Sequence, residues 1–132
     1  MNRTLVTRIG SMVALCAILT GGAGTAYALT TYSSYNTTVG KFNGNGYTGA
    51  QKKSTGSYQG TVKSSSVGGP YKVDAQMQRS DGSQGGSWVL IDDGTTAYLS
   101  NSIPAGTNAR VRFSNALLTP VDVQVSGQFR VY

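Results

Sequence analysis

The chain has 132 residues and a formal net charge of +6, with 18 glycines, one cysteine and no histidine. After Ala28 it contains no cysteine, histidine or glutamate, so the common catalytic bases, thiol nucleophiles and soft metal ligands are missing. We therefore expect a protein that is not an enzyme and needs no cofactor. A disulfide scaffold is excluded as well.

Residues 1–28 have the pattern of an export signal. Arg3 and Arg8 precede a short apolar run, and Ala26 and Ala28 occupy the minus-three and minus-one positions of a cleavage site. The apolar run is shorter than the roughly 20 residues that a membrane-spanning helix needs. We expect cleavage after Ala28 and a secreted, extracellular protein, and the lack of disulfides favours export from a Gram-positive bacterium.

The first half of the exported chain predicts three strands with weak alternation of apolar and polar residues, over residues 35–42, 47–53 and 58–63. Between the first two, Asn43-Gly44-Asn45-Gly46 contains two Asn-Gly pairs, which supply positive φ angles at low cost and predict a turn. Residues 64–70 are expected to form a loop.

The second half predicts five strands, over residues 71–79, 87–91, 95–100, 107–113 and 121–131. Tyr71 has the same parity as the apolar residues of its strand and is expected in the core. Trp88 stands in an apolar run and is also expected to be buried. Asp92-Asp93-Gly94 predicts a hairpin turn. Gly127 predicts a bend, or a place where a large side chain from the facing sheet comes close to the backbone.

These patterns predict one all-β domain over residues 29–132, an antiparallel two-sheet sandwich of about seven or eight short strands. Turn-rich composition, with glycine, serine, threonine and asparagine abundant, agrees with this class.

Charge is divided unevenly along this domain. All five lysines precede Asp74, whereas all its arginines and aspartates follow Lys72. A cationic half favours binding to an anionic cell-wall polymer or a membrane surface, although lysines on edge strands also discourage aggregation. Tyrosines near lysines in glycine- and serine-rich stretches could stack on a sugar. The candidate binding residues are Lys41, Tyr47, Lys52, Lys53, Tyr58 and Lys63. No nucleic-acid partner is expected outside the cell.

Three aspartates are candidates for calcium, because hard cations take carboxylate oxygens. They are Asp81, Asp92 and Asp93. Each precedes or lies next to a glycine in a predicted turn, and turn chemistry alone explains them equally well. We expect no metal site.

The carboxyl-terminal sequence Val123-Gln124-Val125-Ser126-Gly127-Gln128-Phe129 follows Ala109-Arg110-Val111-Arg112-Phe113 and a leader. In this layout the chain resembles small uncharacterised secreted β proteins of Gram-positive bacteria, some of them associated with bacteriocin-type gene neighbourhoods. The resemblance assigns no functional residue.

Three functions are compatible with these features. The leading hypothesis is a secreted, non-enzymatic sandwich that binds a cell-envelope component or the surface of another cell, in microbial competition for example. The second is a structural or matrix protein that associates through sheet edges. The third is a proteinaceous enzyme inhibitor that presents one of the loops over residues 64–70 or 80–87.

Overall fold

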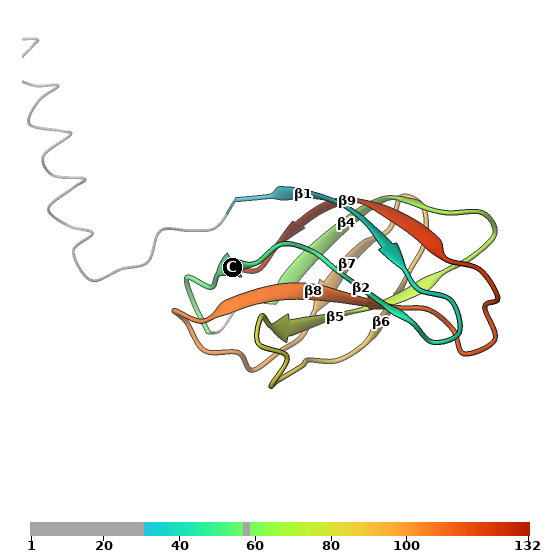
Figure 1. The fold of residues 1–132 in the computed structure, drawn as a ribbon. Helices are drawn as coiled ribbons and strands as arrows, with labels where there is room; N and C mark the ends of the chain where they lie inside the picture. Colours follow the sequence, from blue (N-terminus) through green and yellow to red (C-terminus); the bar gives the residue numbers. More distant parts are fainter. Residues whose placement is uncertain (1–30, 57–58) are drawn as a thin grey trace, which may run out of the picture.

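A computed structural model describes residues 31–56 and 59–132 (Figure 1). The predicted leader, with Ala26 and Ala28, and the candidate Tyr58 lie outside the described residues. Within the described ranges the chain forms nine strands and no helix. The strands are β1 (Ser33–Val39), β2 (Asn45–Tyr47), β3 (Gln51–Lys52), β4 (Gly60–Val67), β5 (Val73–Arg79), β6 (Val89–Ile91), β7 (Thr96–Leu99), β8 (Asn108–Ser114) and β9 (Val123–Arg130).

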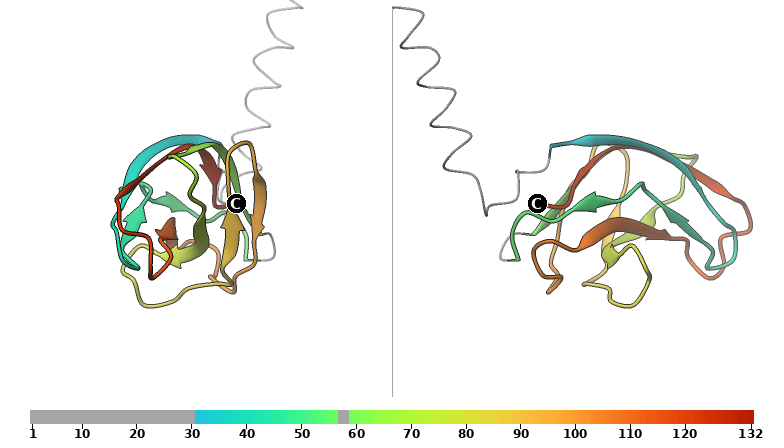
Figure 2. Two further views of the ribbon diagram at one scale, coloured as in Figure 1. Left: turned by 90° about the vertical axis from the view of Figure 1, so that its right-hand side faces the viewer. Right: turned by 60° about the vertical axis from the view of Figure 1, so that its left-hand side comes forward.

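The strands form two antiparallel sheets. One has four strands in the order β1-β9-β4-β7; the other has the order β2-β8-β5-β6, with β3 also paired to β8. The chain crosses repeatedly from one sheet to the other, which Figure 2 shows from two further directions. The prediction of an all-β fold with two antiparallel sheets is confirmed. The described part of the chain contains no helix of the length and hydropathy needed to cross a membrane.

The core lies between the sheets and is built from the inward half of each alternating strand. In the four-stranded sheet Tyr35, Val62 and Phe129 point inward, and Met77 and Phe113 point inward from the five-stranded sheet. The rings of Tyr35 and Phe113 have centroids 5.0 Å apart, a distance typical of favourable aromatic pairs. Each sheet therefore keeps one outward face whose side chains do not contribute to this core.

The observed strands and their pairing correct three predictions. Residues 47–53 form two short strands, not one, because the chain leaves the sheet at residues 48–50. Residues 64–67 continue β4 and are not part of a loop, since Val67 pairs with Val125 of the neighbouring β9. The turn at Asp92-Asp93-Gly94 exists, with the Thr95 amide donating to the Asp92 carbonyl at 3.2 Å. It joins β6 to β7 in different sheets, so it is not a hairpin.

The turn between β1 and β2 also differs from its prediction. The positive φ angles fall on Phe42 (53°) and Asn43 (62°), not on the glycines of the Asn-Gly pairs. Gly44 and Gly46 are needed for space, because a Cβ atom at Gly46 would lie 2.6 Å from the carbonyl oxygen of Thr38, and one at Gly44 would clash with the backbone of Gly40.

Gly127 lies opposite a β-bulge in β4, where the pairing shifts between Ser64 and Ser66. A Cβ atom at this position would clash with the Lys63 carbonyl oxygen and lie 2.9 Å from the Tyr35 hydroxyl. The close approach at Gly127 comes from β4 and β1 of its own sheet, and not from a large side chain of the facing sheet as predicted.

Candidate binding face on the five-stranded sheet

The outward face of the five-stranded sheet carries a ladder of planar polar side chains. β8 contributes Arg110 and Arg112, and the paired β5 contributes Gln78 and Gln76 directly opposite them. Arg110 donates from Nε and NH2 to Gln78 Oε1, at 3.0 and 2.8 Å. Arg112 donates from NH1 to Gln76 Oε1 at 3.4 Å. Alternation in the strands thus places both guanidinium groups on one surface.

Aromatic rings lie against both arginines. The Arg110 guanidinium carbon is 4.0 Å from the ring centre of Tyr47 in β2, and that of Arg112 is 5.3 Å from the ring centre of Trp88. Both distances are within the range of cation–π attraction. Contacts on two sides therefore restrict each guanidinium.

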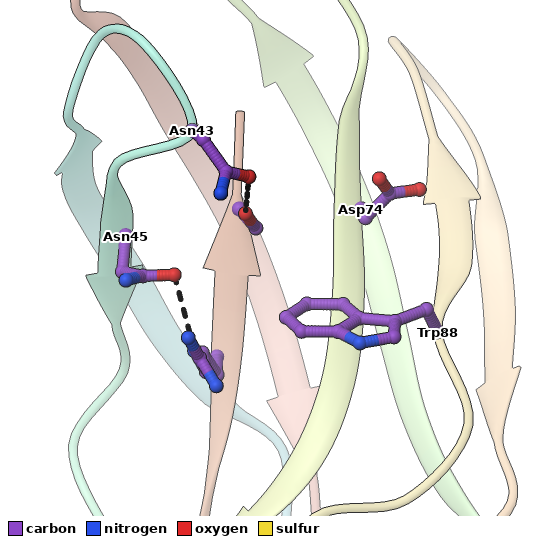
Figure 3. A pocket seen from close by; sticks show the side chains of 6 residues that line it. Asn43, Asn45, Asp74 and Trp88 are labelled. Atoms are coloured by element: carbon purple, nitrogen blue, oxygen red, sulfur yellow. Dashed lines mark hydrogen bonds between the residues drawn. The ribbon is translucent and has the colours of Figure 1, made fainter. Parts of the chain in front are cut away.

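A hollow of about 540 Å³ opens beside Arg112 and Trp88 (Figure 3). Four segments that are distant in the sequence meet there: the β1–β2 turn with the start of β2, the end of β8, the start of β5, and the residue before β6. The lining residues are Asn43, Asn45, Asp74, Trp88, Arg112 and Ser114.

Hydrogen bonds fix one wall of the hollow. Arg112 donates from Nε to Asn45 Oδ1 at 3.1 Å, and the Ser114 hydroxyl donates to Asn43 Oδ1 at 3.4 Å. In Figure 3 the Trp88 ring extends across β5 from the opposite side, with Asp74 beside it. The hollow therefore combines an aromatic face with guanidinium, amide, hydroxyl and carboxylate groups.

The prediction that Trp88 is buried is wrong, since 44% of it is exposed. β6 is the edge strand of its sheet, and Ile91 points into the core while Val89 packs against that core. Trp88 and Leu90 have the opposite parity and face outward. The sequence does not show which parity of this apolar run points inward, so the exposure of Trp88 follows only once Ile91 is seen in the core.

Tyr71, also predicted in the core, is only partly buried and packs against the margin of the core. It precedes β5, where the Tyr71 amide donates to the Gly68 carbonyl oxygen at 3.4 Å.

The lysines predicted to bind a ligand lie on separate parts of the molecule. Lys41 is in the β1–β2 turn, and Lys52 is exposed on β3. Lys63 projects from β4 of the other sheet, with Nζ 4.1 Å from the ring centre of Tyr32. Of the predicted residues, Tyr47 is exposed and belongs to the face described above.

The prediction that Lys53 forms part of a binding surface is wrong, because its side chain is fully buried. Its Nζ donates to Asn101 Oδ1 at 3.1 Å. Its backbone amide donates to the Thr107 carbonyl oxygen, and its own carbonyl oxygen accepts from the Gly106 amide. The β7–β8 connection therefore covers it. Burial lowers the pKa of the Lys53 ammonium group below its ordinary value.

The calcium candidates bond to the chain itself. Asp81 Oδ1 accepts from the amide and the hydroxyl of Ser83, and these bonds hold the pKa of the Asp81 carboxyl below its usual range. Asp93 Oδ1 accepts from the Val67 amide, and Asp92 Oδ1 accepts from the Asp93 amide. Among residues 31–56 and 59–132 there is no group of three or more acidic, histidine or cysteine side chains placed to hold a metal ion.

No protein-family model matches the chain, and no curated protein or solved structure does either.

Proposed function

We propose that the protein is a secreted, non-enzymatic binding protein that recognises a saccharide component of a bacterial cell envelope. The binding site is the hollow beside Trp88 and Arg112. The observation that carries the proposal is the exposed Trp88 ring, held against the Arg112 guanidinium above an open, polar surface.

Sugar rings have apolar C–H faces and a periphery of hydroxyl groups. An exposed indole offers a flat, rigid apolar surface for such a face at low cost in conformational entropy. Asn43, Asn45 and Ser114 provide amide and hydroxyl groups around it, and Asp74 adds a carboxylate acceptor.

The two arginines make this face attractive to a polymer that also carries phosphate or carboxylate groups. Guanidinium groups bind such oxygens with two parallel hydrogen bonds. Asp74 compensates only part of the positive charge of Arg110 and Arg112. We therefore expect an anionic cell-wall glycan to bind more tightly than a neutral one, and more tightly at low ionic strength.

The test is co-sedimentation of the exported protein with purified Gram-positive cell walls over a series of salt concentrations. Trp88→Ala should lower the affinity by about 2- to 13-fold, if ring stacking on the sugar contributes about as much as an aromatic pair, about 0.5–1.5 kcal/mol. Tyr98→Ala is the matched control, because Tyr98 is an exposed aromatic residue on β7 of the other sheet. Absence of binding at the lowest salt concentration overturns the proposal.

One observation favours the alternative of a matrix protein. β1 is at the edge of its sheet, is seven residues long and has no charged side chain, so one of the features that usually discourage edge pairing is missing. Sedimentation velocity at high concentration tests this alternative. A strict monomer contradicts it and leaves the saccharide proposal intact.

A further inference from the structure

Two loops at one end of the sandwich expose a group of apolar side chains. They are the β1–β2 turn and the β8–β9 connection, at the end away from the carboxyl terminus (Figure 1). We call their exposed side chains the apolar tip: Phe42 (56% exposed), Leu117 (68%), Leu118 (86%) and Val121 (42%).

Backbone hydrogen bonds join the two loops into one unit. The Phe42 amide donates to the Thr119 carbonyl oxygen at 2.8 Å, and the Asn43 amide donates to the Ala116 carbonyl oxygen at 3.2 Å. Phe42 therefore lies directly against the loop that carries Leu117 and Leu118.

These loops bury polar side chains and expose apolar ones, the reverse of the usual distribution. Asn115 and Thr119 are buried, at 1% and 7% exposure. The Asn115 amide group donates to the carbonyl oxygens of Val39 and Gly40 at 3.3 and 3.1 Å, and to that of Val121 at 3.3 Å. The loops are thus held in a conformation that leaves the leucines in solvent.

Backbone strain is concentrated at the same place. Phe42 has a φ of 53°, which is rare for a bulky residue without special constraint. Strained residues of this kind persist where the surrounding structure fixes them and are common at functional sites. Here the strained residue carries an exposed aromatic ring.

We propose that the apolar tip inserts into the interfacial region of an anionic lipid bilayer. Aliphatic and aromatic side chains beside a cation are the pattern of interfacial binding. The exposed Lys41 supplies the cation, with Nζ 6.0 Å from the Phe42 ring centre. Its backbone amide donates to Asp122 Oδ1 at 2.9 Å, so an exposed carboxylate lies beside this cation and offsets part of its charge. The net positive charge of the whole chain supplies the remaining attraction to anionic lipid.

A second copy of the chain fits this patch less well. A stable protein interface buries about 800 Å² on each partner, and four side chains on two end loops fall short of this area. A membrane needs no complementary pocket, and each apolar side chain that enters it adds to the free energy of binding on its own.

The test uses the exported chain and vesicles of phosphatidylglycerol and phosphatidylcholine, with vesicles of phosphatidylcholine alone for comparison. We expect binding to the anionic vesicles, and a loss of at least tenfold for the double variant Leu117→Ser/Leu118→Ser. Tyr98→Ser is the control, because Tyr98 is 62% exposed but lies on β7, outside the loops of the tip. It should bind like the wild type.

A fluorescent reporter locates the contact. Leu118→Trp in a Trp88→Phe background should shift its emission to the blue on binding and be quenched by brominated lipid. Trp88→Ala should not alter vesicle binding, so this result is independent of the saccharide proposal.

Three results overturn the inference: no binding of the wild type to anionic vesicles, equal loss in Tyr98→Ser, or unchanged emission of the reporter. A dimer that forms with increasing concentration and is abolished by the double serine variant would assign the tip to a second copy instead.

Discussion

The guanidinium of Arg112 on β8 and the ring of Trp88, the residue before β6, lie 5.3 Å apart although β5 pairs between β8 and β6. Gln76 of β5 links the two sides, because its Oε1 accepts from Arg112 and its Nε2 donates to the Gly86 carbonyl oxygen at 2.9 Å. The side chain of Gln76 is buried beneath them. Trp88 is therefore held from two directions, through Arg112 and through the chain that precedes it.

Gln76→Leu keeps the volume of this side chain and removes both hydrogen bonds. We expect a severalfold loss of glycan affinity, since each bond contributes about 0.5–1.5 kcal/mol, and a faster local motion of Trp88, measured by fluorescence anisotropy. Gln78→Leu is the control, because Gln78 bonds Arg110 and not Arg112. Equal anisotropy in the two variants would show that Gln76 does not hold the ring.

Gly127→Ala tests the close approach at the β4 bulge. The added Cβ would clash with the Lys63 carbonyl oxygen, and overpacking of this kind costs about 1–3 kcal/mol of the free energy of unfolding. At Gly49 nothing lies within 4 Å of such a Cβ, so Gly49→Ala should change stability by less than about 0.5 kcal/mol. Urea denaturation measures both, and similar values for the two variants would contradict the assigned geometry.

Alternation predicted the strands with one buried face well, and β8 and β9 are the clearest examples. It failed at β6, because Trp88-Val89-Leu90-Ile91 is apolar throughout and a short apolar run has no parity signal of its own. The hollow could not be predicted from the sequence for a different reason. Its residues meet only because β2, β8, β5 and β6 are neighbours in an order that the sequence does not state.

The burial of Lys53 had no local signal either. Its neighbour Lys52 is exposed, and the difference depends on the β7–β8 connection, about fifty residues later in the chain. Because burial lowers the pKa of Lys53, the folded protein releases this proton at a lower pH than the unfolded chain, whose ordinary value is 10.5. The unfolded state then binds more protons, so stability should rise with pH through this window.

Lys53→Met isolates this contribution, since the other titrating groups are common to both proteins. The free energy of unfolding of the wild type, minus that of Lys53→Met, should increase as the pH rises toward 10.5. A difference that does not change with pH would mean that burial leaves the Lys53 proton unaffected.

Asn115→Ala removes the donors that hold the two tip loops together. Leaving buried carbonyl groups without partners costs about 1–3 kcal/mol, so we expect a loss of that size in urea denaturation and weaker protection of the Phe42 amide from hydrogen exchange. Asn108→Ala, at an exposed position on β8, is the control and should leave both unchanged. Protection of the Phe42 amide at the wild-type level in Asn115→Ala would show that the Asn115 side chain does not hold the two loops together.

Trp88 is the only tryptophan of the chain, so its emission reports directly on the proposed site. The decisive measurement is a fluorescence titration of the protein with soluble glycan fragments released from purified Gram-positive cell walls. We predict a saturable change in Trp88 emission, with affinity reduced at least tenfold by Arg112→Ala and unaffected by Tyr98→Ala. An emission spectrum that stays constant at saturating glycan, or equal affinities in the two variants, would contradict saccharide binding at this face.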